Sequence, residues 1–141
     1  MDNVAVVVHD LDSAIEFFAE LGMKLEGRAS LGGDLVDRLV GLQGTRSEIA
    51  MMRTPDGHGG IELTRWEQPG AVGPEPRAEP ANVRGMGRVM FAVDDIDDTV
   101  ARLGKLGGQL VGEIVTYENS YRLCYLRGPE GIIIGLAQEI A

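Results

Sequence analysis

Val4–Arg28 reads VAVVVHDLDSAIEFFAELGMKLEGR, and 85 residues later Val89–Glu113 reads VMFAVDDIDDTVARLGKLGGQLVGE. The two stretches align without a gap and are identical at 8 of 25 positions, against roughly 2 expected by chance from ordinary residue frequencies. A second pair of similar segments follows, since Arg53–Gly57 (RTPDG) resembles Arg127–Gly131 (RGPEG). A repeat on this scale indicates two copies of one structural unit in the chain.

Each copy is expected to begin with a strand and a helix. Apolar, partly β-branched runs at Val4–Val8 and Val89–Val93 are typical of short buried strands. In the first copy, Ser13–Glu16 fits a capping box, and the second helix is expected to start near Asp97. The inward faces of the two helices are expected to carry Ala14, Phe17, Phe18 and Leu21, and Val100, Leu103 and Leu106. Gly22 and Gly107 stand where a glycine commonly ends a helix.

Three shorter strands are expected to complete each copy. In the first copy they lie at Leu25–Ala29, Glu48–Arg53 and Gly60–Trp66, with a short helix within Gly33–Leu42. In the second copy they lie at Leu110–Tyr117, Tyr121–Arg127 and Ile132–Ala137. The prediction is an α+β fold of two βαβββ repeats, residues 1–66 and 88–141, forming a curved mixed sheet around a cleft. Residues 67–87 hold four of the six prolines and are expected to link the repeats within one compact domain.

The composition narrows the possible partners. The chain of 141 residues has a formal net charge of −9, and such an acidic surface disfavours nucleic acid and anionic membranes. Its start shows neither a basic leader nor a long apolar span, so no targeting segment is expected. Cys124 is the only cysteine, which excludes an internal disulfide and fits a reducing cytoplasm.

The repeat pattern is similar to the vicinal oxygen chelate superfamily. The residues that carry the resemblance are Val6–Asp12 with Phe17, Phe18, Leu21 and Gly22, then Phe91–Asp97 and Arg127–Gly131. The superfamily includes glyoxalases, methylmalonyl-CoA epimerases, extradiol dioxygenases, fosfomycin-resistance enzymes and bleomycin-resistance binding proteins. The resemblance covers nearly the whole chain. It implies the glyoxalase/bleomycin resistance fold, a small-molecule ligand and a homodimer.

The resemblance also implies where a metal would be bound. In metal-using members, each repeat supplies a histidine at the start of its first strand and a carboxylate in its last strand. These positions correspond here to Asn3 and Glu62 in the first repeat, and to Arg88 and Gly135 in the second. Only Glu62 is a metal ligand by type, because Asn binds transition metals poorly, Arg is a permanent cation and Gly lacks a side chain. A catalytic site needs about three protein ligands, so neither a metal nor another cofactor is expected.

Glu62 and Arg88 are the candidate catalytic residues, and each has a plainer alternative. Glu62 could be a solvated strand residue, but Ile61 and Leu63 flank it and would face the helices, which turns Glu62 toward the cleft. A desolvated Glu62 could then act as a base without metal. Arg88 could simply reach water at a strand end. Alternatively, it occupies the vacated metal position, where it could pair with Glu62 or grip a substrate carboxylate or enolate.

The remaining candidates line the expected cleft. We expect Asn3, Trp66, Met90 and Tyr121 to contact the ligand, since methionine and aromatic side chains suit apolar pockets. The only histidines, His9 and His58, match no family ligand position and are expected at the surface; a new metal site at His58 and Asp56 is the alternative. Cys124 has no histidine near it in sequence and is expected to be inert.

These observations predict a small-molecule-binding protein of the glyoxalase/bleomycin-resistance type that works without metal. It would either sequester its ligand or carry out lyase- or isomerase-like proton transfer with Glu62 as the base. The alternative is a glyoxalase, lyase or epimerase that depends on a divalent metal.

Overall fold

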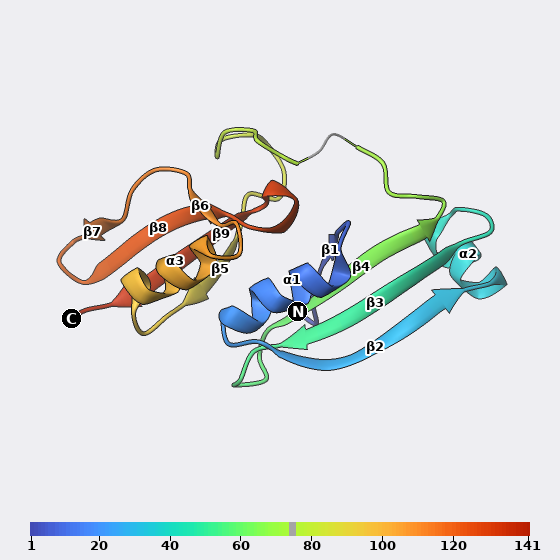
Figure 1. Cartoon of the computed structure of the whole chain (residues 1–141), viewed down its shortest axis with the longest axis horizontal. Helices are drawn as coiled ribbons and strands as arrows, with labels where there is room; N and C mark the ends of the chain where they lie inside the picture. The colour runs from blue at the N-terminus through green and yellow to red at the C-terminus, as the bar shows by residue number, and fades with distance from the viewer. Residues whose placement is uncertain (74–75) are drawn as a thin grey trace. The chain divides into compact units, whose positions relative to one another are not determined.

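The computed structural model describes residues 1–73 and 76–141, which divide into a unit ending at Gly73 and a unit made by the rest of the chain (Figure 1). Each unit contains one copy of the repeat and builds its own mixed sheet around it. The division falls within the predicted linker, although the last strand of the first unit continues to Gln68, beyond the predicted end of the repeat at residue 66.

The first unit is a four-stranded sheet with two helices. Its elements are β1 (Val4–Val7), α1 (Leu11–Glu20), β2 (Lys24–Gly32), α2 (Asp34–Val40), β3 (Arg46–Arg53) and β4 (Gly60–Gln68). The strand order is β1-β4-β3-β2, in which β1 runs parallel to β4 and the other neighbours are antiparallel. The extra helix predicted in this copy is therefore confirmed as α2.

The second unit repeats this topology in a five-stranded sheet. Its elements are β5 (Val89–Ala92), α3 (Ile96–Gly104), β6 (Gln109–Leu110), β7 (Val115–Tyr117), β8 (Tyr121–Arg127), a 3-10 turn (Pro129–Gly131) and β9 (Ile133–Glu139). The order is β5-β9-β8-β6, and β7 also pairs with β8. The single strand predicted over Leu110–Tyr117 is wrong, since it divides into β6 and β7 around Gly112. A glycine inside a strand weakens it, because it adds backbone entropy and offers no side chain to pack.

An aspartate is the N-cap residue of both α1 and α3, at equivalent positions of the repeat. The Asp10 carboxylate accepts hydrogen bonds from the Ser13 backbone N–H at 3.0 Å and from its hydroxyl at 2.9 Å. These bonds lower the pKa of Asp10. Asp95 accepts the Asp98 N–H in the same way, at 3.0 Å. The capping box predicted at Ser13 is therefore wrong, because Asp10 already satisfies the free N–H of the first turn and the helix begins at Leu11.

α1 and α3 each lie against one face of the sheet in their own unit (Figure 1), and the buried apolar side chains lie on that face. The predicted inward residues Ala14, Phe17, Phe18 and Leu103 are buried, whereas Leu21, Val100 and Leu106 are only half-buried. The sheets contribute Ala50, Met52, Ile61 and Leu63 in the first unit, and Cys124, Leu126, Ile134 and Leu136 in the second. We call the face opposite α1 in the first sheet, and opposite α3 in the second, the open face of that unit.

Candidate functional site

Glu62 lies on the open face of the first sheet, near the middle of β4. Its neighbours Ile61 and Leu63 are 3% and 0% exposed and belong to the core beneath α1. Because successive side chains of a strand point to opposite faces, Glu62 projects away from that helix. Its register partners are Ala5 on β1 and Met51 on β3. The side chain is half-buried, and within the described ranges its carboxylate has no ion pair or hydrogen bond.

The surroundings of Glu62 on this face are mainly apolar. By strand alternation Trp66 shares the face, two side chains further along β4, with the buried Thr64 between them. Met51 and Ile49 on β3 are half-buried, and Val7 on β1 is 47% exposed. The structure thus brings together two of the candidate residues, Glu62 and Trp66, beside side chains that suit an apolar ligand.

The equivalent position in the second unit is closed by its neighbours. Gly135 pairs with Met90 on β5 and with Tyr125 on β8. A Cβ atom on Gly135 would lie 3.2 Å from the Met90 Cγ, and 3.4 Å from both the Met90 Sδ and the Tyr125 Cε1. Met90 and Tyr125 therefore occupy the space where a side chain at this position would begin.

Arg88 stands immediately before β5 and stacks on the same tyrosine. The central guanidinium carbon, Cζ, lies 4.9 Å from the centroid of the Tyr125 ring, within the range of a cation–π contact. Tyr121 shares the open face with Tyr125, because the two residues are four apart in β8, and Tyr117 pairs with it from β7. The structure thus groups the candidates Arg88, Met90 and Tyr121 on one face and adds Tyr125 as their centre.

The other sequence candidates, Asn3, His58 and Cys124, are engaged by sequence neighbours or buried. The Asn3 side-chain amide precedes β1 and donates to the Asp2 carboxylate at 3.1 Å. His58 is 87% exposed in a turn, with its Nδ1 3.9 Å from an Asp56 oxygen. Within the described residues no three His, Cys, Asp or Glu side chains gather as a metal site. Burial raises the pKa of the Cys124 thiol, which disfavours a reactive thiolate.

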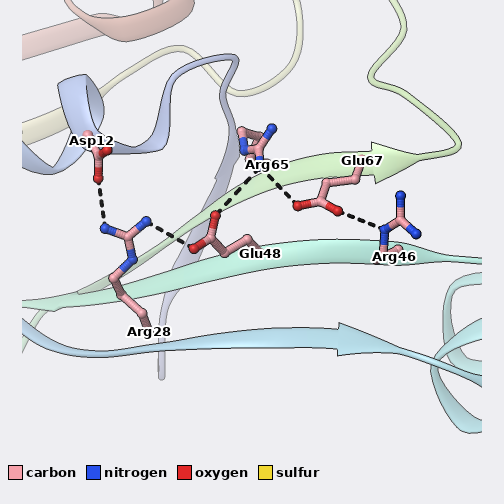
Figure 2. A network of polar contacts seen from close by, with 6 residues as sticks. All are labelled: Asp12, Arg28, Arg46, Glu48, Arg65 and Glu67. Atoms are coloured by element: carbon pink, nitrogen blue, oxygen red, sulfur yellow. Dashed lines mark hydrogen bonds and ion pairs between the residues drawn. The ribbon is translucent and has the colours of Figure 1, made fainter.

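A chain of ion pairs covers the other face of the first sheet, beside α1 (Figure 2). Opposite charges alternate along it in the order Asp12, Arg28, Glu48, Arg65, Glu67 and Arg46. The successive nitrogen–oxygen distances are 2.7, 3.0, 3.7, 2.9 and 2.7 Å.

Because each charge in this chain has an opposite neighbour, we interpret the network as a structural link between α1 and strands β2, β3 and β4. The network was not predicted from the sequence. The sequence does contain a pattern that predicts such pairs. Opposite charges stand two residues apart, and so on one strand face, at Arg46 and Glu48 and again at Arg65 and Glu67.

Comparison with known families gives a match to the Glyoxalase/Bleomycin resistance protein/Dioxygenase superfamily over residues 1–136. The chain belongs to this superfamily. Among solved structures, a glyoxalase family protein from Bacillus cereus is 56% identical, with a TM-score of 0.95 over 100% of this chain and 94% of that one. The predicted α+β fold of two βαβββ repeats is thereby confirmed, with one mixed sheet in each repeat.

More distant structures of the superfamily share the fold. A glyoxalase/bleomycin resistance protein/dioxygenase domain from Frankia is 19% identical, with a TM-score of 0.66 over 99% of this chain and 97% of that one. A glyoxalase I mutant from Zea mays is 21% identical, with a TM-score of 0.68 over 100% of this chain and 46% of that one. A search of curated proteins gave no match. None of the helices in the described ranges is both long and apolar enough to cross a membrane.

Proposed function

We propose that this chain binds a small molecule on an open face of its sheets and acts on it without a metal ion, with Glu62 as the proton acceptor. The observation that carries the proposal is the half-buried carboxylate of Glu62, which lies among apolar side chains with no partner in the described ranges. A carboxylate held in this way is available to take a proton from a bound ligand.

The residues at the family's metal positions support the metal-independent form of the proposal. Asn3 has a side-chain amide that donates to the Asp2 carboxylate. Arg88 is a permanent cation, which repels a metal ion, and it lies over the Tyr125 ring. The carboxylate position of the second repeat is Gly135, which has no side chain to ligate a metal, and a Cβ atom there would lie 3.2 Å from the Met90 Cγ. Glu62 alone cannot hold a catalytic divalent ion, because such sites need about three protein ligands.

The roles of the other candidates follow from the faces on which they lie. Trp66 would contact a ligand beside Glu62 on the open face of the first unit, and Met90 and Tyr121 would contact a ligand on the open face of the second. Arg88 would neutralise negative charge on the ligand, and Asn3 would hydrogen-bond to it. Arg88 and Glu62 belong to different units, so their pairing stays a prediction.

The wider setting is also a proposal. We propose a homodimer in the cytoplasm that does not bind nucleic acid or membranes. The edge strand β2 supports the dimer, because all nine of its residues are exposed and its outer edge has no partner strand in the described chain. The net charge of −9 supports the absence of polyanionic partners.

Glu62→Gln tests the catalytic half of the proposal. The change keeps the size of the side chain and removes its ability to accept a proton. We expect turnover of a true substrate to fall by at least about 100-fold, since general-base catalysis contributes roughly 10²–10⁴-fold. Affinity measured by calorimetry should change less than about threefold. Glu16→Gln, on the exposed side of α1, is the matched control and should keep full turnover. Unchanged turnover in Glu62→Gln would exclude Glu62 as the base.

Metal analysis tests the other half. We expect protein purified without chelators to contain less than about one tenth of an equivalent of nickel, zinc, cobalt or iron, because the four family positions offer one suitable ligand. The measurement is elemental analysis of the purified chain. A content near one equivalent, lost in Glu62→Gln and retained in Glu16→Gln, would instead favour a metal-dependent glyoxalase, lyase or epimerase.

A further inference from the structure

Arg88 differs from the other arginines packed on the second sheet and its helix. Arg102 pairs with Asp98, Arg122 pairs with Asp97, and Arg127 donates to the backbone carbonyl of Gly131. Arg88 has no carboxylate partner in the part of the chain that the structure describes, and it contacts the Tyr125 ring instead. The chain as a whole has a net charge of −9, so an arginine without a carboxylate partner can attract an anion to this place specifically.

Stacking on an aromatic ring leaves the hydrogen-bonding edge of a guanidinium available. The five N–H donors of arginine lie in the plane of the group, whereas a cation–π contact uses its flat face or its charge. An arginine held over Tyr125 can therefore still bind a carboxylate through two parallel N–H···O bonds. The tyrosine also restricts the side chain before the ligand arrives, which reduces the entropy lost on binding.

The open face of the second sheet carries small side chains at Ala92 and Ala137, with Leu123 opposite Ala137 on β8. Ala92 on β5 pairs with Ala137 on β9, one step along the sheet from Gly135. Ala92 is exposed and Ala137 is half-buried. Met90 and Tyr121 share this face and are 44% and 42% exposed. Small residues next to rigid aromatic and flexible thioether side chains present a flat apolar surface, which is complementary to a planar ring.

We infer that the open face of the second sheet binds a planar aromatic carboxylate, with the ring against Ala92 and Ala137 and the carboxylate on Arg88. This inference rests on the proposed function and names its ligand class. The carboxylate accepts hydrogen bonds from Arg88, and the ring packs against Tyr125, Tyr121 and Met90. The net charge of −9 gives the chain no general attraction for anions, so Arg88 is the cation on which the test turns.

Calorimetry and backbone-amide NMR with 1-naphthoate test the inference on the full chain. We expect 1-naphthoate to bind and to shift amide signals of β5, β8 and β9. Arg88→Ala should weaken binding at least about tenfold, because a hydrogen bond to a charged group contributes roughly 1.5–3 kcal/mol. Arg88→Lys should also weaken it, because an ammonium group lacks the planar two-bond fork. Arg84→Ala, an exposed arginine four residues earlier, is the matched control and should bind as the wild type does.

Two further compounds test whether binding requires both the carboxylate and the planar ring. Cyclohexanecarboxylate has the charge without the flat ring, and 1-naphthylmethanol has the ring without the charge. Weaker binding of both supports the inference. Equal binding of cyclohexanecarboxylate, or no effect of Arg88→Ala, overturns it.

Binding of 1-naphthylmethanol but not of 1-naphthoate refutes the ligand class and leaves small-molecule binding on this face intact. If the amide NMR signals of both open faces respond to none of the three compounds, the inference is refuted. The proposed function is then decided separately, by the turnover measured for Glu62→Gln. Signals on this face that shift with protein concentration alone, without ligand, would show that a second copy covers it and overturn the inference.

Discussion

Phe18→Ala is expected to lower the free energy of unfolding by about 3–5 kcal/mol, the usual cost of deleting a buried aromatic ring. Phe18 is 0% exposed at the centre of the first core. Its ring meets that of Phe17 edge to face, with centroids 5.5 Å apart. The deletion removes the apolar contacts of the ring and leaves a cavity that α1 and the sheet can fill only in part. Urea denaturation followed by circular dichroism measures the loss.

The repeat supplies a matched comparison for this change. Leu103 occupies the equivalent position on α3 and is also 0% exposed, so Leu103→Ala should cost about 2–5 kcal/mol in the second unit. Leu39 on α2 is 84% exposed, and Leu39→Ala should change stability by no more than about 0.5 kcal/mol. A cost for Phe18→Ala as small as that for Leu39→Ala would contradict the assigned core.

The internal repeat, the apolar pattern and the superfamily resemblance were together sufficient to predict the fold but not the ends of its elements. The faces of α1 and α3 could be predicted because buried residues recur at helical spacing. The helix start could not, since Asp10 and Ser13 are both good N-cap residues and the pattern ranks neither. Only the three-dimensional structure shows that Asp10 accepts from both the N–H and the hydroxyl of Ser13.

The candidate site could be predicted only where strand alternation decides it. Buried Ile61 and Leu63 place Glu62 on the opposite face of β4, as the sequence indicated. The closure of Gly135 by Met90 and Tyr125 depends on the register of three strands, and sequence spacing does not determine that register. The contact between Arg88 and Tyr125 was missed for the same reason, because the two residues lie 37 apart in the chain.

The two copies of the repeat thus carry different chemistry at equivalent positions. The first unit presents the carboxylate of Glu62 on its open face, and the second presents Arg88 on Tyr125.

Gly131→Ala is expected to destabilise the protein more than Gly57→Ala, although the two glycines end equivalent turns. Both have positive φ, +73° at Gly131 and +79° at Gly57, which costs an L-residue about 1–2 kcal/mol. A Cβ atom on Gly57 meets nothing within 4 Å. On Gly131 it would overlap the backbone carbonyl oxygen of Arg77, and overpacking of this kind typically costs about 1–3 kcal/mol more.

The difference in destabilisation between the two variants measures how firmly the segment after residue 75 is held against the turn at Gly131. Arg77 donates its N–H to the Glu130 carbonyl at 2.9 Å, and Arg127 donates to the carbonyls of Gly131 and Glu79. A side chain at Gly131 would separate these groups, so limited proteolysis near Arg77 and Arg84 should speed up in Gly131→Ala and stay unchanged in Gly57→Ala. Equal destabilisation in the two variants, with equal cleavage rates, would show that the segment is not held against this turn, because only the shared cost of positive φ would then remain.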